Sequence, residues 1–416
     1  MFSPTFSAKS RKMIPHKIYN KLSQMLIISV LGVWNTVSAQ KPMTETEALR
    51  IVRERHPAVQ ASEAAIRSAR TLQSGAVRNW EPAEIYHNIA ADPDLGMFGT
   101  STLGLTQAFP SARQTRANRH LYEQQTVLHE AERSLVQHHL AREVRDIFQH
   151  LSYLDEKRRV LTSLDSLYQR TSTIADSRYR NGEVAADEQL AIRDQSTRIR
   201  LDLQTISHET TFDREVLAQL LGENEPLTPV IAPFTRRTFS LADTSRIREG
   251  ATARVDAGKA LVSEAMAGVE KARKAPLFTA GVNVQYLANG AVYPGYTVGM
   301  RLPLAGRNMS ARTSAAMATA DAARFQTEAT VRNQQMELAH LLHEVEKYEI
   351  LLEYYDKEGS ALAKELRRSA FQRYNAGESD FSELVQSADR ALRIEMEYLD
   401  NLHMLNRTIL EIEMLF

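Results

Sequence analysis

The sequence predicts a mainly α-helical protein with a small β part, in which long coiled-coil helical hairpins form two internal repeats and four strands accompany them. The phrase Arg-Tyr-Arg-Asn-Gly-Glu at residues 178–183 returns as Arg-Tyr-Asn-Ala-Gly-Glu at residues 373–378. Residues 113–180 contain neither proline nor glycine, and a helix of that length extends for roughly 100 Å. Residues 84–109 and 277–303 instead alternate apolar with polar or small residues, as strands do.

The two copies of the phrase indicate an internal duplication, because other features of the chain recur with them. Gly104 and Gly299 lie in the two strand-like stretches, and the interval between them equals the interval between the two phrases. We therefore assign residues 40–236 to a first structural repeat and residues 237–416 to a second, with the two repeats intertwined in one domain.

Each repeat is expected to contain a helix, a strand pair and a long helical hairpin. In the first repeat these are residues 45–78, 84–109, 113–180 and 184–221; in the second they are residues 242–274, 277–303, 310–375 and a return helix from Phe381 to Ile412. Apolar residues at spacings of three, four and seven, such as Leu154, Leu161 and Leu164, predict coiled-coil packing of the hairpins. The glycine of each repeated phrase can take a positive φ and so form the hairpin tip. Three prolines make residues 222–239 a surface linker.

The strand pairs suggest a barrel that several chains share. Phe278, Val282 and Tyr286 alternate with Thr279 and Asn283, which is typical of a membrane barrel strand and equally of a half-buried hairpin in a soluble domain. Two strand pairs give four strands, whereas a closed barrel needs about eight. An open sheet edge is not tolerated in a membrane, so a membrane location requires a homo-oligomer, and three chains would supply twelve strands.

Residues 1–39 are predicted to be a secretory signal peptide. They hold several basic residues and no acidic one, and an apolar run at residues 22–33 precedes Val37 and Ala39 at the two positions that a signal peptidase recognises. The run is too short to span a bilayer comfortably as an anchor. The mature chain would begin at Gln40 with a slight excess of acidic residues, which argues against nucleic acid as a partner.

The sequence also excludes several kinds of active site. It contains no cysteine, so neither disulfide bonds nor thiolate metal ligands are possible. It has no nucleotide-binding loop, no zinc-protease motif and no Ser-His-Asp grouping. We expect a protein that is not an enzyme and binds no cofactor.

One histidine pair raises the question of a metal site. His340 and His343 lie with Glu337 and Glu344 within two turns of a predicted helix, and a His-x-x-His pair on a helix can bind a metal ion. A solvated helix face has the same composition and is the expected interpretation, so we assign no metal site.

The order of these elements resembles the TolC family of outer membrane factors. The motifs that carry the resemblance are the strand exits Leu105-Thr106-Gln107-Ala108-Phe109 and Met300-Arg301-Leu302-Pro303-Leu304 and the two Arg-Tyr-x-x-Gly-Glu tips, and it covers nearly all of residues 40–416. The resemblance implies a homotrimer with a twelve-stranded barrel in outer membrane lipid and a helical tunnel in the periplasm. Such a trimer is a passive exit duct of a tripartite efflux pump or a type I secretion system. Its partners are a periplasmic adaptor (membrane fusion) protein and an inner-membrane pump such as an RND transporter.

The resemblance also implies which residues contact the adaptor and which form the gate. The adaptor-contacting tips would be Tyr179, Gly182, Glu183, Tyr374, Gly377 and Glu378. The gate and selectivity residues would be Glu383 first, then Asp380, with Asp187 and Glu188 from the first tip. A ring of carboxylates favours cations, although acidic residues also occur at helix N-termini simply because they stabilise them. In some members an arginine near the second tip holds the gate shut; Ser379 occupies that position here, which puts this lock in doubt.

A soluble periplasmic coiled-coil scaffold or adaptor is the alternative function. It explains the signal peptide and the long helices as well as a channel does. It does not explain why two strand pairs with an apolar face recur at matched positions. The need for detergent during extraction discriminates between the two classes of protein.

Overall fold

The structure, a computed structural model, describes residues 42–76, 81–92, 97–225, 227–238, 246–302 and 306–416. The predicted signal peptide lies outside the described residues, as do Pro303 and Leu304 of the second strand exit. Residues Met43–Phe416 form one compact unit. Within the described ranges, no helix is both long enough and apolar enough to span a membrane.

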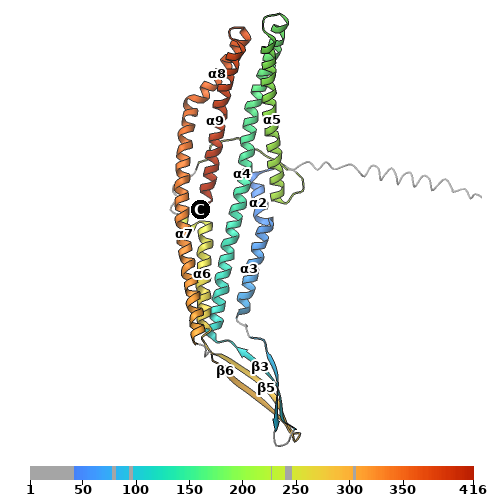
Figure 1. The fold of residues 1–416 in the computed structure, drawn as a ribbon, viewed down its shortest axis with the longest axis vertical. Helices are drawn as coiled ribbons and strands as arrows, with labels where there is room; N and C mark the ends of the chain where they lie inside the picture. The colour runs from blue at the N-terminus through green and yellow to red at the C-terminus, as the bar shows by residue number, and fades with distance from the viewer. Residues whose placement is uncertain (1–41, 77–80, 93–96, 226, 239–245, 303–305) are drawn as a thin grey trace, which may run out of the picture. The chain divides into compact units, whose positions relative to one another are not determined.

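The first half of the unit contains the predicted helix, strand pair and hairpin (Figure 1). These elements are α2 (Glu45–Arg55), α3 (Pro57–Gly75), β2 (Glu84–Asp92), β3 (Met97–Phe109), α4 (Ala112–Arg180) and α5 (Ala186–Leu221). α4 has 69 residues, which corresponds to about 100 Å. The expected first helix is divided at His56, since Pro57 cannot continue a helix and the His56 Nδ1 atom instead accepts from the N–H of Ala58 at 3.2 Å.

The second half repeats the same order, with one interruption. Its elements are α6 (Ala251–Ala272), β5 (Leu277–Leu287), β6 (Val292–Arg301), α7 (Gly306–Tyr354), the π-helical turn η3 (Tyr355–Gly359), α8 (Ser360–Ala376) and α9 (Phe381–Glu413). The expected single helix over residues 310–375 is thus wrong at η3. Gly359 leaves room there for the ring of Tyr355, since a Cβ on Gly359 would lie 2.9 Å from Tyr355 Cδ1. The Tyr355 hydroxyl donates to Glu397 of α9 at 3.1 Å.

The four long strands form one antiparallel sheet in the order β2-β3-β5-β6. The register aligns Ile85 with Leu105, Leu105 with Val282, and Val282 with Tyr296, so these four side chains form a row across one face. The residues that alternate with them on the opposite face are mainly polar or small. Gly281 is required by the close approach of β3, because a Cβ there would lie 2.4 Å from the carbonyl oxygen of Leu105.

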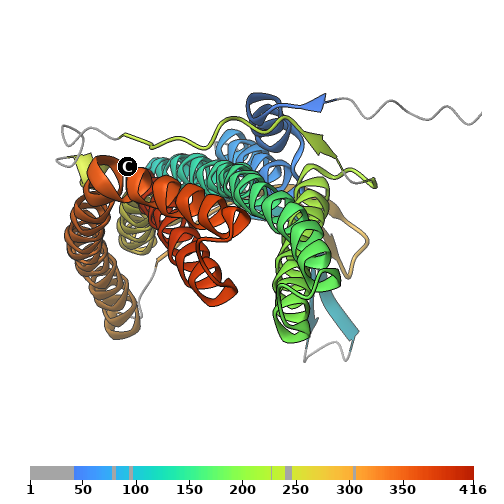
Figure 2. The same cartoon turned by 90° about the horizontal axis from the view of Figure 1, so that it is seen from above.

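The two hairpins are packed against each other through a shared apolar cluster. It includes Leu161 and Tyr168 of α4, Ile192 of α5, Phe371 of α8 and Leu384 of α9, all of them buried. Full burial of such a side chain contributes about 1.5–3 kcal/mol. Seen from above, α4 lies between α5 and α9 (Figure 2). The cluster therefore holds the helices of both repeats side by side as the coiled-coil spacing predicted.

Part of the predicted linker is an extended strap, defined here as residues 227–238 (Figure 2). The N–H of Val230 donates to the carbonyl oxygen of Met43 at 2.8 Å, where the short strands β1 (Pro42–Met43) and β4 (Thr228–Pro229) meet. Further along, the buried Asn406 of α9 accepts from the N–H of Arg237 at 2.8 Å and donates to the carbonyl oxygen of Thr235 at 2.9 Å. The strap is thus fixed to both halves of the unit.

Candidate functional site: the hairpin tips

The two hairpin tips have the same backbone structure. Gly182 has a φ of 76° and Gly377 a φ of 78°, the left-handed region that ends helices. The N–H of the next residue, Glu183 or Glu378, donates to the carbonyl oxygen of the arginine that opens the phrase, at 2.9 Å in both tips. The repeated phrase therefore encodes one local structure twice: a helix that is closed by a glycine and turned back on itself.

The two tyrosines of the phrase have different surroundings. Tyr374 of the second tip is fully buried, whereas Tyr179 of the first tip is 44% exposed. The Tyr374 hydroxyl donates to Glu188 of α5 at 2.7 Å. Burial and this carboxylate raise the pKa of Tyr374 above its usual value, so the phenol stays protonated as a donor. Equivalent positions in the sequence thus have unequal roles, since only Tyr374 joins the two hairpins.

Arg178 makes a second connection between the hairpins. Its guanidinium donates to the carbonyl oxygens of Tyr374 at 3.0 Å and Asn375 at 3.2 Å, and it lies over the Tyr374 ring at 5.4 Å from the centroid. A Cβ on Gly377 would lie 3.0 Å from this guanidinium. We call Arg178, Tyr374 and Glu188 the tip joint. The arginine of this contact belongs to the first tip, so the missing arginine at Ser379 does not leave the tips unconnected.

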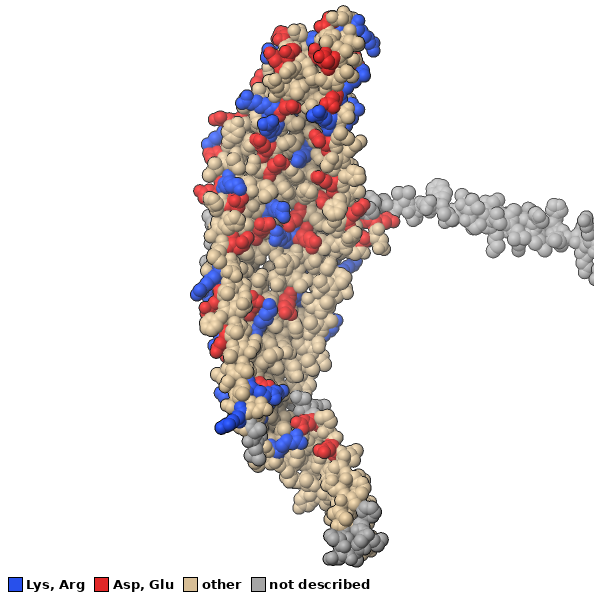
Figure 3. Space-filling model, viewed as in Figure 1, with Lys and Arg blue, Asp and Glu red and all other residues tan. Residues whose placement is uncertain are grey.

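Acidic side chains gather around a hollow of about 630 Å³ between the tips. Five carboxylates and one guanidinium line it: Glu183, Glu188, Glu378, Asp380, Glu383 and Arg178. Gly377 lines the same hollow, whereas Tyr179, Gly182, Asp187 and the buried Tyr374 do not. Figure 3 shows charged side chains of both signs at this end of the hairpins. The structure thus brings together most, but not all, of the residues that the sequence suggested.

The acidic residues also have local structural roles. Asp380 is the N-cap of α9, and its Oδ1 accepts from the N–H of Glu383 at 2.8 Å. The Glu383 carboxylate accepts from Arg373 at 3.3 Å, and both side chains are more than half exposed. Asp187 lies in the first turn of α5 and accepts from the N–H of Glu188 at 3.1 Å. Helix capping therefore accounts for Asp380, while Glu383 has only an exposed ion pair, a weak interaction.

His340 and His343 lie on α7 beside Glu344. In the described part of the chain, no group of three or more histidine, aspartate or glutamate side chains is placed to hold a metal ion. Glu344 instead accepts from Lys347 at 2.8 Å, and this hydrogen bond lowers the pKa of the Glu344 carboxyl. His340 and His343 are both exposed on α7.

A polar cluster midway along α4 was not predicted. His150 of α4 lies 2.7 Å from the carboxylate of Asp213 on α5, and the ring of His403 on α9 stacks on Tyr153 at 4.4 Å. Tyr153 also donates to Asp400 of α9. Burial lowers the pKa of His403 to about 4, and the nearby His150 acts in the same direction. These residues are far apart in the sequence, so no local motif could have revealed them.

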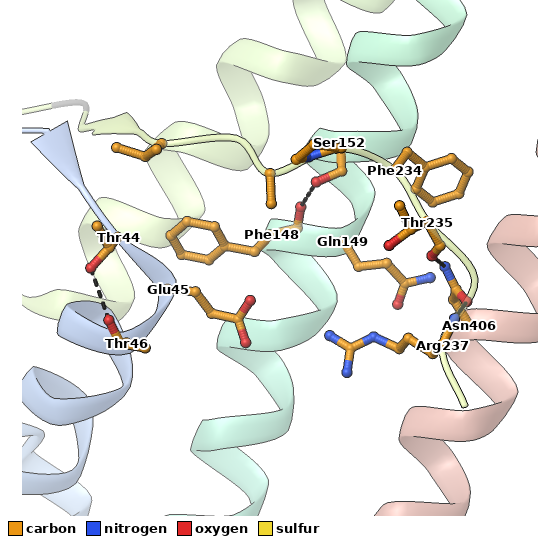
Figure 4. Close-up of a pocket in the computed structure, with 13 residues that line it drawn as sticks. Thr44, Glu45, Thr46, Phe148, Gln149, Ser152, Phe234, Thr235, Arg237 and Asn406 are labelled. Atoms are coloured by element: carbon orange, nitrogen blue, oxygen red, sulfur yellow. Dashed lines mark hydrogen bonds between the residues drawn. The ribbon is translucent and has the colours of Figure 1, made fainter. Parts of the chain in front are cut away.

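A second hollow, of about 430 Å³, lies beneath the strap (Figure 4). Phe148 and Gln149 of α4 line it, together with Thr44 and residues of the strap. The Thr44 side chain accepts from the N–H of Glu47, and Gln149 donates to the carbonyl oxygen of His403. Because these polar groups bond within the protein, we interpret the hollow as part of the joint between the strap and α4.

Comparisons with known proteins agree on one architecture. No protein-family model and no curated protein matches the sequence. Among solved structures, the outer-membrane channel OprN is 18% identical, with a TM-score of 0.75 and 89% of each chain covered. CusC, whose structures concern folding and transmembrane channel formation, is 13% identical with a TM-score of 0.74. The match covers 89% of this chain and 91% of CusC. VceC, an outer membrane protein of Vibrio cholerae, is 14% identical with a TM-score of 0.73. The match covers 89% of this chain and 94% of VceC. The chain therefore has the fold of these outer-membrane channels, and its resemblance to TolC family outer membrane factors is confirmed at the level of the fold.

Proposed function

We propose that the protein is a passive exit duct of the outer membrane, assembled as a homotrimer and extended into the periplasm by its helical hairpins. The observation that carries the proposal is the apolar row across the sheet. Ile85, Leu105, Val282 and Tyr296 are 75%, 44%, 62% and 85% exposed. A contiguous exposed apolar face is unusual on a soluble monomer, and lipid hydrocarbon is the environment that suits it.

The edges of the sheet support a shared barrel. Within the described residues, β2 and β6 each pair with a neighbour on one side only. Unpaired backbone N–H and C=O groups in hydrocarbon cost several kcal/mol each, so these edges must be paired in a membrane. Pairing β6 of one copy with β2 of the next would continue the antiparallel order, and three copies would close a barrel of twelve strands.

The tips suit contact with an adaptor. Tyr179, Glu183 and Glu378 are exposed at the ends of the hairpins, where no other part of the described chain covers them. A periplasmic adaptor that binds these tips would join the duct to an inner-membrane pump, such as an RND transporter, or to a type I secretion system. The pump supplies the energy, because the duct itself has no nucleotide-binding motif.

The carboxylates around the tip hollow suit a cation-selective gate. In a trimer, Glu383, Asp380 and Glu188, which line the hollow, and Asp187, which precedes Glu188 in the first turn of α5, would each occur three times around one axis. A ring of exposed carboxylates attracts cations and repels anions. Glu383 is the leading residue, since among the described residues its carboxylate contacts one basic side chain, Arg373, in an exposed ion pair.

The mass of the particle tests the proposal. Protein extracted from outer membranes is measured by light scattering, with the detergent contribution subtracted, and then inserted into planar bilayers for conductance. A mass near three chains together with single-channel conductance is the expected result. A monomer that is released from the membrane fraction by buffer without detergent would contradict the channel proposal and favour a periplasmic scaffold.

A further inference from the structure

Positively charged side chains gather where the helices meet the sheet. α4 begins shortly after β3, α6 ends shortly before β5, and α7 begins shortly after β6. We define the basic collar as the exposed side chains of Arg113, Arg116, Arg119, Lys271, Arg273, Lys274, Arg301, Arg307 and Arg312. Figure 3 shows blue side chains at this level of the molecule.

Few acidic side chains neutralise the collar. Glu81 pairs with Arg301 at 3.0 Å, and Glu270 pairs with Arg273 at 2.7 Å and with Arg312 at 3.4 Å. No ion pair within the described ranges involves the remaining collar residues, which are Arg113, Arg116, Arg119, Lys271, Lys274 and Arg307. The collar therefore keeps a large excess of positive charge.

Some of this charge is placed against the local preference of the helices. Arg113 lies in the first turn of α4 and Arg307 in the first turn of α7, and neither first turn contains an acidic residue. The positive end of a helix dipole favours an anion and disfavours a cation. A sequence that breaks this local rule at two helix starts in one region indicates a compensating partner, here one with negative charge.

The apolar face of the sheet ends at the collar. The register aligns Phe109 with Phe278 and Phe278 with Met300, which gives an apolar row adjacent to the charged residues. Phe278, Met300 and the following Leu302 are each about half exposed. Long basic side chains beside an apolar band place their alkyl stems along hydrocarbon and their charged groups at the headgroups. The opposite end of the sheet lacks such charge, since the turn at residues 288–291 is Ala-Asn-Gly-Ala.

We propose that the basic collar binds the phosphate-bearing headgroups of anionic phospholipids in the leaflet at the helical end of the sheet. The inference rests on the proposed function, in which the sheet lies in a membrane. It adds a lipid preference and an orientation in the membrane. The apolar face explains why the sheet enters the bilayer, whereas the charge of the collar would fix the depth at which the duct sits.

Lipid retention tests the proposal. The full-length protein is reconstituted in nanodiscs of phosphatidylcholine with a minor share of phosphatidylglycerol, and native mass spectrometry measures which lipids stay bound after release. We expect enrichment of phosphatidylglycerol in the wild type. The triple variant Arg113→Gln/Arg116→Gln/Arg307→Gln should lose about half or more of this enrichment, because each basic residue near the bilayer surface adds to the attraction for anionic headgroups. A second variant, Lys271→Gln/Lys274→Gln, should lose it too, and higher salt should weaken it in the wild type.

Matched controls separate the possible outcomes. Arg170→Gln/Arg332→Gln/Arg390→Gln removes three exposed charges of the hairpins and should retain the wild-type enrichment. Equal enrichment in the wild type and both collar variants would overturn the collar proposal and leave the duct intact. A chain that stays outside nanodiscs of every composition would overturn the duct as well. Inorganic phosphate is added at the same concentration as the phosphatidylglycerol in the nanodiscs. If it displaced the bound phosphatidylglycerol, the collar would be a general anion site, and the assignment to lipid would be wrong.

Discussion

Tyr374 of α8 donates a hydrogen bond of 2.7 Å to Glu188 of α5, and this bond joins the tip of the second hairpin to the start of the returning helix of the first. The donor is fully buried. A hydrogen bond to a charged acceptor contributes more than one between neutral groups. Any widening of the space between the hairpins must break this contact, so the tip joint opposes opening of the proposed gate.

Removal of the Tyr374 hydroxyl should loosen the tips. We expect Tyr374→Phe to lower stability by about 1–2 kcal/mol, since Glu188 loses a hydrogen bond while the ring stays packed. In planar bilayers the variant should spend more time in a conducting state. Tyr179→Phe is the matched control, because the equivalent tyrosine of the first tip is exposed. Equal conductance in the two variants would contradict a locking role for Tyr374.

Arg178 should not be replaceable by lysine. The two Nη atoms of Arg178 donate to two successive carbonyl oxygens, and the flat guanidinium lies over the Tyr374 ring. A lysine ammonium lacks this fork geometry. We expect Arg178→Lys to raise conductance almost as much as Arg178→Gln does. Arg373→Lys serves as the comparison at the equivalent position, and wild-type behaviour of Arg178→Lys would show that charge alone suffices.

The capping role of Asp380 can be separated from its charge. Asparagine caps a helix about as well as aspartate, so Asp380→Asn should leave the melting temperature unchanged, whereas Asp380→Ala should cost about 1 kcal/mol. Combined with Glu383→Gln, Asp380→Asn should reduce the preference for cations in reversal-potential measurements. An unchanged reversal potential in the double variant would remove these residues from the selectivity site.

His403 should make the protein sensitive to acid. Its folded pKa of about 4 lies below the usual value of about 6.5, so the folded state favours the neutral ring. The stability linked to His403 is fully present above pH 6.5 and is lost as the pH falls towards 4. The groups around the ring are His150, Tyr153, Lys157, Asp400 and Arg407.

His403→Phe tests this linkage, because phenylalanine keeps the stacking on Tyr153 and cannot be protonated. We expect the difference in melting temperature between neutral pH and about pH 5 to shrink in this variant. His343→Phe, on the exposed face of α7, should behave like the wild type. A full acid response in His403→Phe would assign the sensitivity to other groups.

The sequence predicted the elements whose cause is local. Alternation with a period of two predicted which strand residues share the apolar face, and Val282 and Tyr296 do lie on it. The glycines of the repeated phrase predicted both tips, because Gly182 and Gly377 each end a helix through a positive φ. In both cases residues close together in the sequence determine the local backbone conformation.

What the sequence did not predict depends on contacts between distant residues. Arg178 and Tyr374 belong to different repeats, and the shared Arg-Tyr-x-x-Gly-Glu pattern gave no sign that one tyrosine would be buried and the other exposed. The cluster of His150, Asp213 and His403 likewise forms only when three helices pack. The π-helical turn was hidden because its residues are compatible with an ordinary α-helix.

The π-helical turn sets the angular position of everything beyond it on α8. Each residue of an α-helix advances the chain by about 100° around the axis. The wider turn at Tyr355–Gly359 changes that phase for all of α8, including Tyr374, whose hydroxyl donates to Glu188. Deletion of one residue from the turn would rotate the phenol away from its acceptor with no change in the composition of the tip. The fit of the two tips therefore depends on the number of residues in a segment about four helical turns before Tyr374, as much as on the side chains at the tip itself.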